Sequence, residues 1–302
     1  MRRVIGVDLG GTKINAGVVD DTGKICNNII LETLAGQGRD VVIKRIVEAV
    51  QSIMEDDIIG IGITSPGFIN SDDGIVEFAG NIKGWTGLNM HKTFSRYFPG
   101  KELRIENDAN MAALCEKWVG SGKDLKSFVM LTLGTGLGGA IYHEAMGLWL
   151  GANYQGAELG HMILYPNGRA CNCGQLGCAE KYIAGSALSI NYEELTNDIL
   201  DGHEIISKIE SDESARAALD KFVDDLATFL VSIKNCHDPE GVILGGGFIN
   251  SREKWWSLLL ERFNEKCNRP EGIKIVPAKF LNDSGIIGAA KSVLDVIDKQ
   301  GS

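Results

Sequence analysis

Two glycine-rich turns, each set between apolar strands, constrain the fold of this chain more than any other feature. The first turn, DLGGTK at 8–13, joins predicted strands at 3–7 and 14–19. The second turn, GTGLGGA at 134–140, follows the apolar run SFVMLTL at 127–133. Glycine allows a sharp turn and lets backbone N–H groups approach an anion closely. The repeated pattern predicts a duplicated architecture with one phosphate-binding turn in each half.

The rest of the chain alternates strands and helices, which is typical of an α/β fold. Further strands are expected at 58–63, 103–106, 139–142, 241–244 and 273–278. Helices are expected at 40–54, from about Ala109, at 216–235, at 252–267 and at about 286–300.

Polar and glycine residues gather at 118–126, and this composition is typical of a domain boundary. We therefore expect a smaller α/β domain at 1–120 and a larger α/β domain at 121–302. The C-terminal helix is expected to pack back on the first domain.

Charge and composition exclude several classes of partner. The 302 residues carry a formal net charge of −10, which repels nucleic acid and anionic membranes. The apolar N-terminal stretch is too short for a signal peptide, and no later run is long enough to span a bilayer. We expect a cytoplasmic protein without nucleic-acid or membrane partners. Its scattered cysteines suit a reducing compartment.

A third glycine turn, Gly245-Gly246-Gly247, also follows a predicted strand. Three such turns indicate a nucleotide whose phosphates lie on the two hairpins and whose adenosine lies near the third turn. GTGLGG fits a dinucleotide-binding pattern by its letters, but that turn must open a helix, and AIYHEA reads as a strand. The Walker A pattern is absent from the sequence.

Two charged residues beside the first turn suit phosphate chemistry. Asp8 ends the first strand, where a carboxylate can coordinate Mg²⁺ directly or through water. A turn-capping aspartate is the alternative. Lys13 can pair with a phosphate oxygen or can be an ordinary solvated lysine.

ENDAN at 106–110 lies where a strand ends and a helix begins. In α/β sheets, ligands collect outside the carboxyl ends of strands. Asp108 can accept the proton of a substrate hydroxyl there, while Asn107 fixes a neighbouring hydroxyl. The alternative is an ordinary helix N-cap.

CNCGQLGCAE at 171–180 places three cysteines in eight positions. Zn²⁺ prefers four tetrahedral nitrogen or sulfur ligands, and His161 is the histidine nearest to these three thiols. The spacing favours zinc, with structural thiols or a labile disulfide as alternatives. Cysteines one residue apart do not bridge readily, and a reducing compartment disfavours a disulfide further. Four protein ligands leave no position for water, so such a metal is structural.

The order of these motifs resembles that of the ROK family of bacterial sugar kinases and related repressors. The motifs are DLGGTK at 8–13, ENDAN at 106–110, LTLGTGLGGA at 131–140, GAELGHM at 156–162, CNCGQLGCAE at 171–180 and VILGGG at 242–247. The resemblance covers essentially the whole chain. The cysteine motif with its upstream Gly-His is its most diagnostic part.

The resemblance implies an actin-like (ribonuclease H-like) two-domain sugar kinase fold of the α/β class with an interdomain cleft. It also implies roles for individual residues, with Asp108 as the general base that deprotonates the accepting sugar hydroxyl. The implied sugar ligands are Gly67, Asn81, Asn107, Asp108, Glu158, His161 and Glu180. The implied nucleotide-binding residues are Gly10, Gly11, Thr12, Lys13, Gly134, Thr135, Gly136, Gly245 and Gly246, with Asp8 beside them. The implied zinc ligands are His161, Cys171, Cys173 and Cys178.

The activity implied by the resemblance is phosphorylation of a hexose by ATP with Mg²⁺. GNIKGW, ENDAN and GAELGH look most similar to the bacterial glucokinases of the family, which favours the 6-hydroxyl of glucose. The alternatives are N-acetylmannosamine, N-acetylglucosamine, fructose or β-glucoside kinases, a non-catalytic sugar sensor, and an NAD-linked dehydrogenase. Family repressors carry an N-terminal winged helix-turn-helix, and this sequence starts at the first phosphate strand, so we expect a kinase. Its relatives imply a homo-oligomer, a dimer or tetramer.

Overall fold

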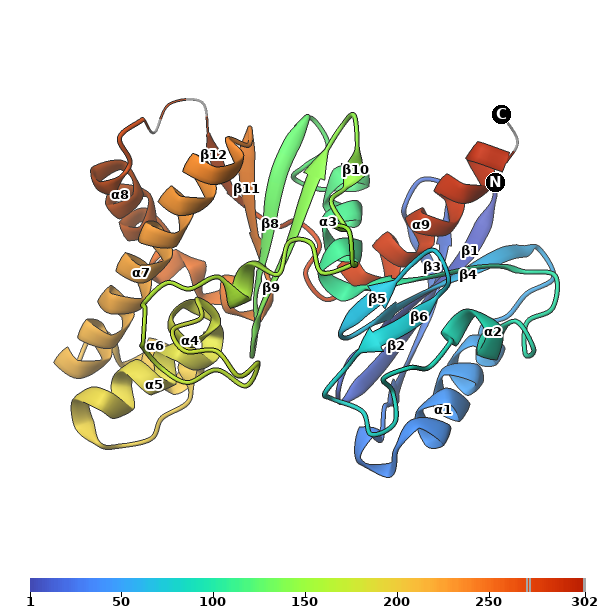
Figure 1. Ribbon diagram of the computed structural model, residues 1–302, viewed down its shortest axis with the longest axis horizontal. Coiled ribbons are helices and arrows are strands. Elements are labelled where there is room, and N and C mark those ends of the chain that lie inside the picture. Colours follow the sequence, from blue (N-terminus) through green and yellow to red (C-terminus); the bar gives the residue numbers. More distant parts are fainter. Residues whose placement is uncertain (270, 272, 301–302) are drawn as a thin grey trace. The chain divides into compact units, whose positions relative to one another are not determined.

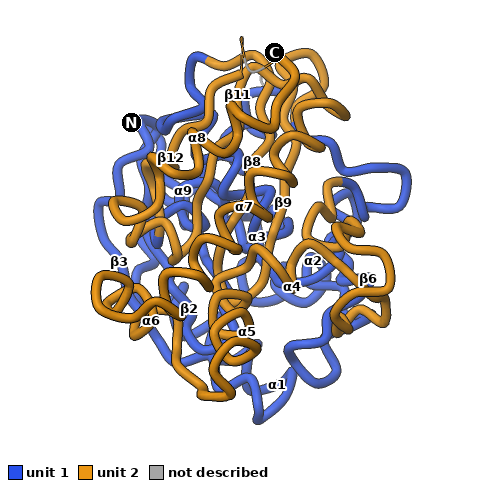
Figure 2. Tube along the Cα trace, turned by 90° about the vertical axis from the view of Figure 1, so that its left-hand side faces the viewer, with its two compact units in different colours: residues 1–124, 148–156, 282–302 blue, residues 125–147, 157–281 orange. Residues whose placement is uncertain are grey.

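The chain forms two units, each built around a five-stranded sheet, and Figure 2 colours them separately. The structure is a computed structural model that describes residues 1–269, 271 and 273–300. Unit 1 comprises Met1–Asp124, Leu148–Gly156 and Asn282–Ser302, and unit 2 comprises Leu125–Gly147 and Ala157–Leu281. Unit 1 thus takes in two stretches that lie, in sequence, inside the predicted range 121–302.

The sheet of unit 1 is mixed. Its strands, in order across the sheet, are β3 (Ile25–Glu32), β2 (Lys13–Asp20), β1 (Arg3–Leu9), β4 (Ile58–Ser65) and β7 (Glu102–Asn107). β1 pairs antiparallel with β2 and parallel with β4, and β4 pairs parallel with β7. The other elements are the 3-10 helix η1 (Ala35–Gln37), α1 (Arg39–Ser52), β5 (Phe68–Asn70), β6 (Ile75–Phe78), α2 (Met90–Phe94), α3 (Asp108–Val119) and α9 (Ser284–Gln300).

Strand β1 is buried on both faces. Its odd-numbered apolar residues Ile5 and Val7 pack in the cluster that contains the apolar face of α1. Val4 packs against α9 on the opposite face (Figure 1). Because side chains alternate along a strand, a nearly continuous apolar run is what a strand covered on two sides requires.

Helix α9 packs so closely on the sheet that the contacts need glycine. A Cβ at Gly6 of β1 would lie 1.9 Å from the carbonyl oxygen of Ile286, and one at Gly62 of β4 would meet the helix backbone in the same way. Helix α3 makes a third contact of this kind, because a Cβ at Gly288 would lie 1.8 Å from the carbonyl oxygen of Met111. Backbone therefore touches backbone at three places.

The sheet of unit 2 repeats the strand order of the first. Its strands, in order, are β10 (Gly147–Leu148), β9 (Leu137–His143), β8 (Ser127–Leu133), β11 (Gly241–Gly245) and β12 (Lys274–Pro277). β8 pairs antiparallel with β9 and parallel with β11, as β1 pairs with β2 and β4. The predicted duplication is confirmed by this shared topology.

One face of the second sheet is covered by helices. They are the 3-10 helix η2 (Leu159–His161), α4 (Glu180–Ile183), α5 (Gly185–Thr196), α6 (Gly202–Lys208), α7 (Glu213–His237), the 3-10 helix η3 (Gly247–Lys254) and α8 (Trp256–Lys266). Leu226 and Leu230 of α7 share one core with Val129 and Leu131 of β8. Within the part of the chain that the structure describes, no helix is both long and apolar enough to cross a bilayer.

The predicted elements are confirmed except at one helix. Residues 252–267 were expected to form one helix, but α8 begins only at Trp256, after the 3-10 segment η3. The break falls at Trp255, whose φ of −141° leaves the helical region. Its buried ring stacks on Phe248 with the centroids 5.2 Å apart, so packing of the ring fixes the chain there. The strands β3, β5, β6 and β10 and the helices α2, α5 and α6 were not predicted.

Replacing Gly288 with alanine should destabilise the protein by about 2–3 kcal/mol, because two backbones must move apart. In an ordinary helix interior the same change stabilises by about 0.5–1 kcal/mol, so even the sign is diagnostic. Gly36→Ala is the matched control, since nothing lies within 4 Å of its added Cβ. Urea denaturation measures both. A Gly288→Ala variant as stable as the control would contradict the close contact.

Candidate functional site

The turn between β1 and β2 is held from one side and open on the other. The N–H of Gly10 donates to the carbonyl oxygen of Lys13 (2.9 Å). Thr33 donates its hydroxyl to the carbonyl oxygen of Gly10 (2.7 Å) and its N–H to that of Thr12 (2.9 Å). Gly11, Thr12 and Lys13 are exposed. An exposed glycine turn with a fixed backbone suits an anion.

Asp8 lies half-buried at the end of β1, beside this turn. The hydroxyl of Thr64 donates to Asp8 Oδ1 (2.8 Å) and itself accepts the N–H of Leu9 (3.1 Å). Burial raises the pKa of Asp8 to about 6; the Thr64 hydrogen bond acts against this, and the negative charge of Asp108 adds to it. A Cβ at Gly285 of α9 would lie 2.5 Å from the carboxyl carbon of Asp8. A carboxylate of this kind suits a hard cation such as Mg²⁺.

Asn107 and Asp108 lie where β7 ends and α3 begins. Asn107 is the N-cap of α3, because its side-chain oxygen accepts the N–H of Ala109 (2.9 Å) and that of Asn110 (3.4 Å). Asp108 is the first helical residue, and its Oδ1 also accepts the N–H of Ala109 (2.9 Å). Its side chain reaches solvent, while nearby protein atoms that displace water raise the pKa of Asp108. Asn107 therefore caps the helix, and Asp108 is not required for that role.

Behind this pair lies a second, buried carboxylate. Glu106 accepts the N–H of Asn107 (2.7 Å) and a side-chain N–H of Asn110 (3.2 Å), and burial raises its pKa. The side-chain amide of Asn107 donates to the carbonyl oxygen of Gly67 (3.0 Å). The structure therefore brings Gly67 and Asn107 together. Asn81 lies in an exposed loop between β6 and α2, and no hydrogen bond among the described residues joins it to this group.

In unit 2, Glu180 lies against the turn between β8 and β9. The N–H of Leu137 donates to Glu180 Oε2 (3.1 Å), and a Cβ at Gly136 would lie 2.6 Å from the same oxygen. Gly185 donates its N–H to the carbonyl oxygen of Gly134 (2.7 Å). A predicted sugar ligand and a predicted phosphate turn are thus in direct contact.

A pocket of about 410 Å³ opens beside this turn within unit 2. Its walls come from the turn itself, from the first residues of α5 and α6, and from η3. They include Thr135, Ser186, His203, Phe248 and Asn250. A volume of this size fits a small organic ligand.

The third glycine turn meets this pocket at Gly247. The predicted residues Gly245 and Gly246 instead pack against β8, since added Cβ atoms would lie 2.9 Å from Met130 Cε and 2.4 Å from the carbonyl oxygen of Leu133. The pocket walls on α5 and α6 were missed from the sequence. α6 is short, and the apolar residues of α5 do not gather clearly on one face, so neither helix gave a periodic signal.

The four predicted metal ligands lie together in unit 2. They are His161, Cys171, Cys173 and Cys178, and their donor atoms all lie within 4.8 Å of one another. The Cys173 and Cys178 sulfurs are 3.6 Å apart, and the Cys171 sulfur is 3.8 Å from Nδ1 of His161. Ligands about 2.3 Å from a tetrahedral Zn²⁺ are separated by about 3.8 Å. The donor set and its spacing therefore fit zinc.

The backbone of the cysteine segment is shaped for this cluster. The N–H of Cys171 donates to the carbonyl oxygen of Gln175 (2.9 Å), and that of Gly174 to the carbonyl oxygen of Cys171 (3.0 Å). Gly174 and Gly177 have φ values of 92° and 83°, which favour glycine. His161 ends η2 and donates its N–H to the carbonyl oxygen of Glu158 (3.0 Å). Glu158 therefore lies one turn before the cluster.

Asp8→Asn should raise the melting temperature of the ligand-free protein at pH 8 and leave it nearly unchanged at pH 4. The carboxylate is charged above about pH 4 in the unfolded chain but only above about pH 6 in the folded one, so wild-type stability falls as the pH rises through that window. The amide side chain of the variant carries no such charge. Thermal melts of both proteins and of the exposed-site control Asp56→Asn check this. If the melting temperatures of Asp8→Asn and the wild type differed by the same amount at pH 4 and pH 8, this prediction would be wrong.

The comparisons with known proteins agree with this geometry. The model of the ROK family matches residues 4–296. Glucokinase of Thermotoga maritima is 33% identical over 98% of both chains, and N-acetyl-D-glucosamine kinase of Salmonella paratyphi A is 32% identical over 81% of this chain and 84% of that one. The crystal structure of a ROK family glucokinase from Streptomyces griseus in complex with glucose and AMPPNP superposes with a TM-score of 0.84, at 28% identity over 97% of this chain and 99% of that one. The duplicated α/β units are thus those of the actin-like fold, and the chain belongs to the ROK family.

Proposed function

We propose that the protein transfers the γ-phosphoryl group of ATP to a hexose, with the 6-hydroxyl of glucose as the preferred acceptor. The observation that carries this proposal is the carboxylate of Asp108, oriented by a helix N-terminus and open to solvent. Beside it, Asn107 is fixed by the carbonyl oxygen of Gly67. These groups suit a substrate that presents adjacent hydroxyls.

Asp108 is the proposed general base. The acceptor hydroxyl oxygen attacks the γ-phosphorus in line, its proton passes to Asp108, and ADP leaves. Nearby protein atoms that displace water raise the pKa of Asp108, which makes its carboxylate a stronger base than an ordinary aspartate. Asn107 is proposed to hold the neighbouring hydroxyl and so to orient the attacking one.

The nucleotide is assigned to the glycine turns. The exposed N–H groups of Gly11 and Thr12 and the fixed turn at Gly134 are proposed to bind phosphate oxygens, with Lys13 as an added cation. The pocket beside Thr135 has the size for a nucleoside. Asp8 would hold Mg²⁺, which when bound supplies positive charge to the phosphates.

The remaining sugar ligands are assigned to the region of the metal cluster. His161 points Nδ1 at the cluster, so its Nε2 is the atom proposed to meet a sugar hydroxyl. Glu158 and Glu180 are proposed to accept hydrogen bonds from further sugar hydroxyls. Zn²⁺ held by the four donors has no open position, so its proposed role is to fix these neighbours.

The preference for glucose comes from the names of two relatives, one named for glucose and the other for N-acetyl-D-glucosamine. The Thermotoga maritima relative is a glucokinase, and the Salmonella paratyphi A relative acts on N-acetyl-D-glucosamine. The two sugars differ only at the 2-position, so N-acetylglucosamine is the second candidate. Mannosamine-derived, fructose and β-glucoside substrates, and a non-catalytic sensor, complete the set that the experiment must separate.

Asp108→Asn should lower kcat by about a thousandfold, because the proton then has no acceptor, while sugar binding persists. ADP release is measured across a panel of glucose, N-acetylglucosamine, N-acetylmannosamine, fructose and a β-glucoside. Asp56→Asn, exposed in the same unit, is the matched control. Wild-type turnover that is highest with glucose supports the proposal. Near-normal turnover of Asp108→Asn would remove its base, and no turnover with any sugar would favour the sensor.

Removing the metal should weaken sugar binding before nucleotide binding. Purified protein is expected to hold one Zn²⁺ per chain, and Cys173→Ser to lose it, with sugar affinity falling about tenfold or more because His161 is released. Cys236→Ser, an exposed thiol outside the cluster, is the control. Metal analysis and calorimetric titration with sugar and nucleotide measure these effects. Normal sugar affinity in zinc-free protein would break the link between cluster and substrate.

A further inference from the structure

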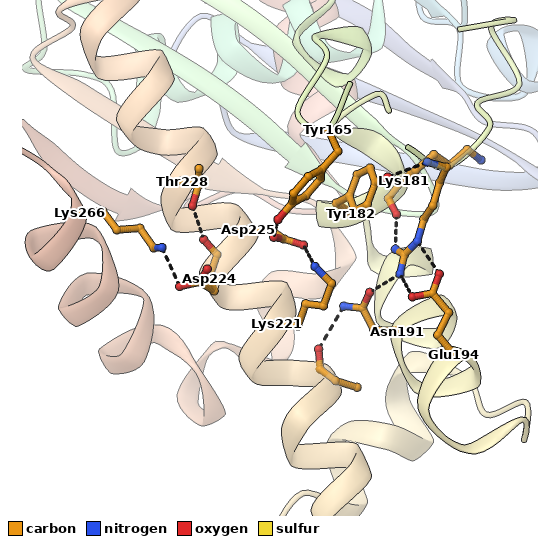
Figure 3. Close-up of polar contacts among 12 residues, drawn as sticks. Tyr165, Lys181, Tyr182, Asn191, Glu194, Lys221, Asp224, Asp225, Thr228 and Lys266 are labelled. Atoms are coloured by element: carbon orange, nitrogen blue, oxygen red, sulfur yellow. Dashed lines mark hydrogen bonds and ion pairs between the residues drawn. The ribbon is translucent and has the colours of Figure 1, made fainter. Parts of the chain in front are cut away.

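Helix α7 carries a buried carboxylate that faces the cysteine loop, defined here as residues 162–179. Asp225 is only 2% exposed, and its Oδ1 accepts a hydrogen bond from the hydroxyl of Tyr165 (2.5 Å). Its Oδ2 accepts a hydrogen bond from the ammonium of Lys221, one turn earlier on the same helix (2.9 Å). Figure 3 shows this contact. A buried charge is stable only with partners of this kind. Because Lys221 and Tyr165 each bind one oxygen of the carboxylate, the position of the Tyr165 hydroxyl is fixed.

The backbone of Tyr165 contacts both halves of the cysteine loop, the segment before the cysteines and the segment after them. Its N–H donates to the carbonyl oxygen of Gly177 (3.2 Å), and its carbonyl oxygen accepts the N–H of Gly168 (3.0 Å). A Cβ at Gly177 would lie 1.7 Å from that same carbonyl oxygen. The backbone before the cysteines therefore touches the backbone after them at Tyr165, and a shift of this residue moves both.

The ring of Tyr165 continues the contact to the end of the loop. Its centroid lies 4.6 Å from that of Tyr182, which is in α4 two residues after Glu180. Lys221 lies 5.1 Å from the centre of the Tyr165 ring, and the guanidinium of Arg169 lies 4.8 Å from the centre of the Tyr182 ring. Each ring thus has a cation over it: Lys221 of α7 over Tyr165, and Arg169 of the loop over Tyr182.

Arg169 ties the same segment to α5. Its guanidinium donates to Glu194 (2.8 Å), to Asn191 (2.8 Å) and to the carbonyl oxygen of Lys181 (2.7 Å). Its backbone N–H donates to the hydroxyl of Tyr182 (2.7 Å). The loop is therefore held at two points by helices that contain none of the assigned ligands, and Figure 3 shows the α5 and α7 partners together.

His161 and Glu180 stand at the two ends of this loop. His161 immediately precedes it, and Glu180 immediately follows it and accepts the N–H of Leu137. Where the loop lies on α7 therefore determines where both side chains lie.

We propose that Asp225 is a positioning residue for the sugar site: through Tyr165 it sets the cysteine loop on α7 and so places His161 and Glu180. This inference rests on the proposed function, because it assumes that those two residues bind the sugar. Asp225 itself touches no substrate.

The test compares Asp225→Asn with Asp224→Asn. Asp224 is the next residue of α7, and it pairs instead with Lys266 of α8 (2.9 Å), away from the loop (Figure 3). Asp225→Asn should raise the KM for sugar about tenfold, which is the scale of a lost charge-assisted hydrogen bond, with kcat, the KM for ATP and zinc content unchanged. Asp224→Asn should change none of them. Tyr165→Phe should match Asp225→Asn, and the double variant should be no worse than either, because both changes remove one interaction.

Amide hydrogen exchange gives a readout without turnover. The N–H groups of Gly177 and Ala179, which donate to carbonyl oxygens at Arg169 and Met162, should exchange faster in Asp225→Asn and in Tyr165→Phe. If the wild-type protein phosphorylates no sugar, the proposed function fails. The exchange measurement still tests whether the contact between Asp225 and Tyr165 holds the cysteine loop. Faster exchange with an unchanged sugar KM overturns the link to the substrate. Unchanged exchange, or equal effects in Asp224→Asn, overturns the positioning role itself.

Discussion

The packing of α9 on β1 and α3 is the contact on which unit 1 depends. Helices normally lie 8–10 Å apart because side chains separate them. Here glycines at Gly6 and Gly288 let backbones touch, so the end of the chain becomes part of the core formed by its beginning. The same approach sets Gly285 against the carboxyl group of Asp8. A packing constraint thereby determines the surroundings of the proposed Mg²⁺ ligand.

Those surroundings have an energetic cost that points to function. Asp8 and Glu106 both have pKa values raised by burial, so the folded protein holds two carboxyl groups where their charge is disfavoured. A fold selected for stability alone would place apolar or amide side chains there. Buried acids at the carboxyl ends of parallel strands in one sheet, here β1 and β7, are typical of an active site.

Local signals made much of the structure predictable. Apolar runs of four to eight residues and the glycines after them located the strands and turns. The three cysteines of CNCGQLGC and the nearest histidine, His161, are the four residues that the structure brings together. The edge strand β3 was missed because its exposed polar residues Asn27, Asn28 and Glu32 interrupt the apolar pattern. The pocket walls from α5 and α6 were missed because their residues meet only in the folded unit.

The contact between Tyr165 and Asp225 could not be predicted from the sequence. Tyr165 and Asp225 are 60 residues apart, and each alone looks ordinary: a partly exposed tyrosine in a loop and an acid on an amphipathic helix. Asp224 and Asp225 cannot be told apart by composition or by helical period, yet one is buried and the other half exposed. Only the rotation of α7 against its sheet decides which of them faces the loop. The positions of such residues are therefore set by tertiary packing and not by any local pattern.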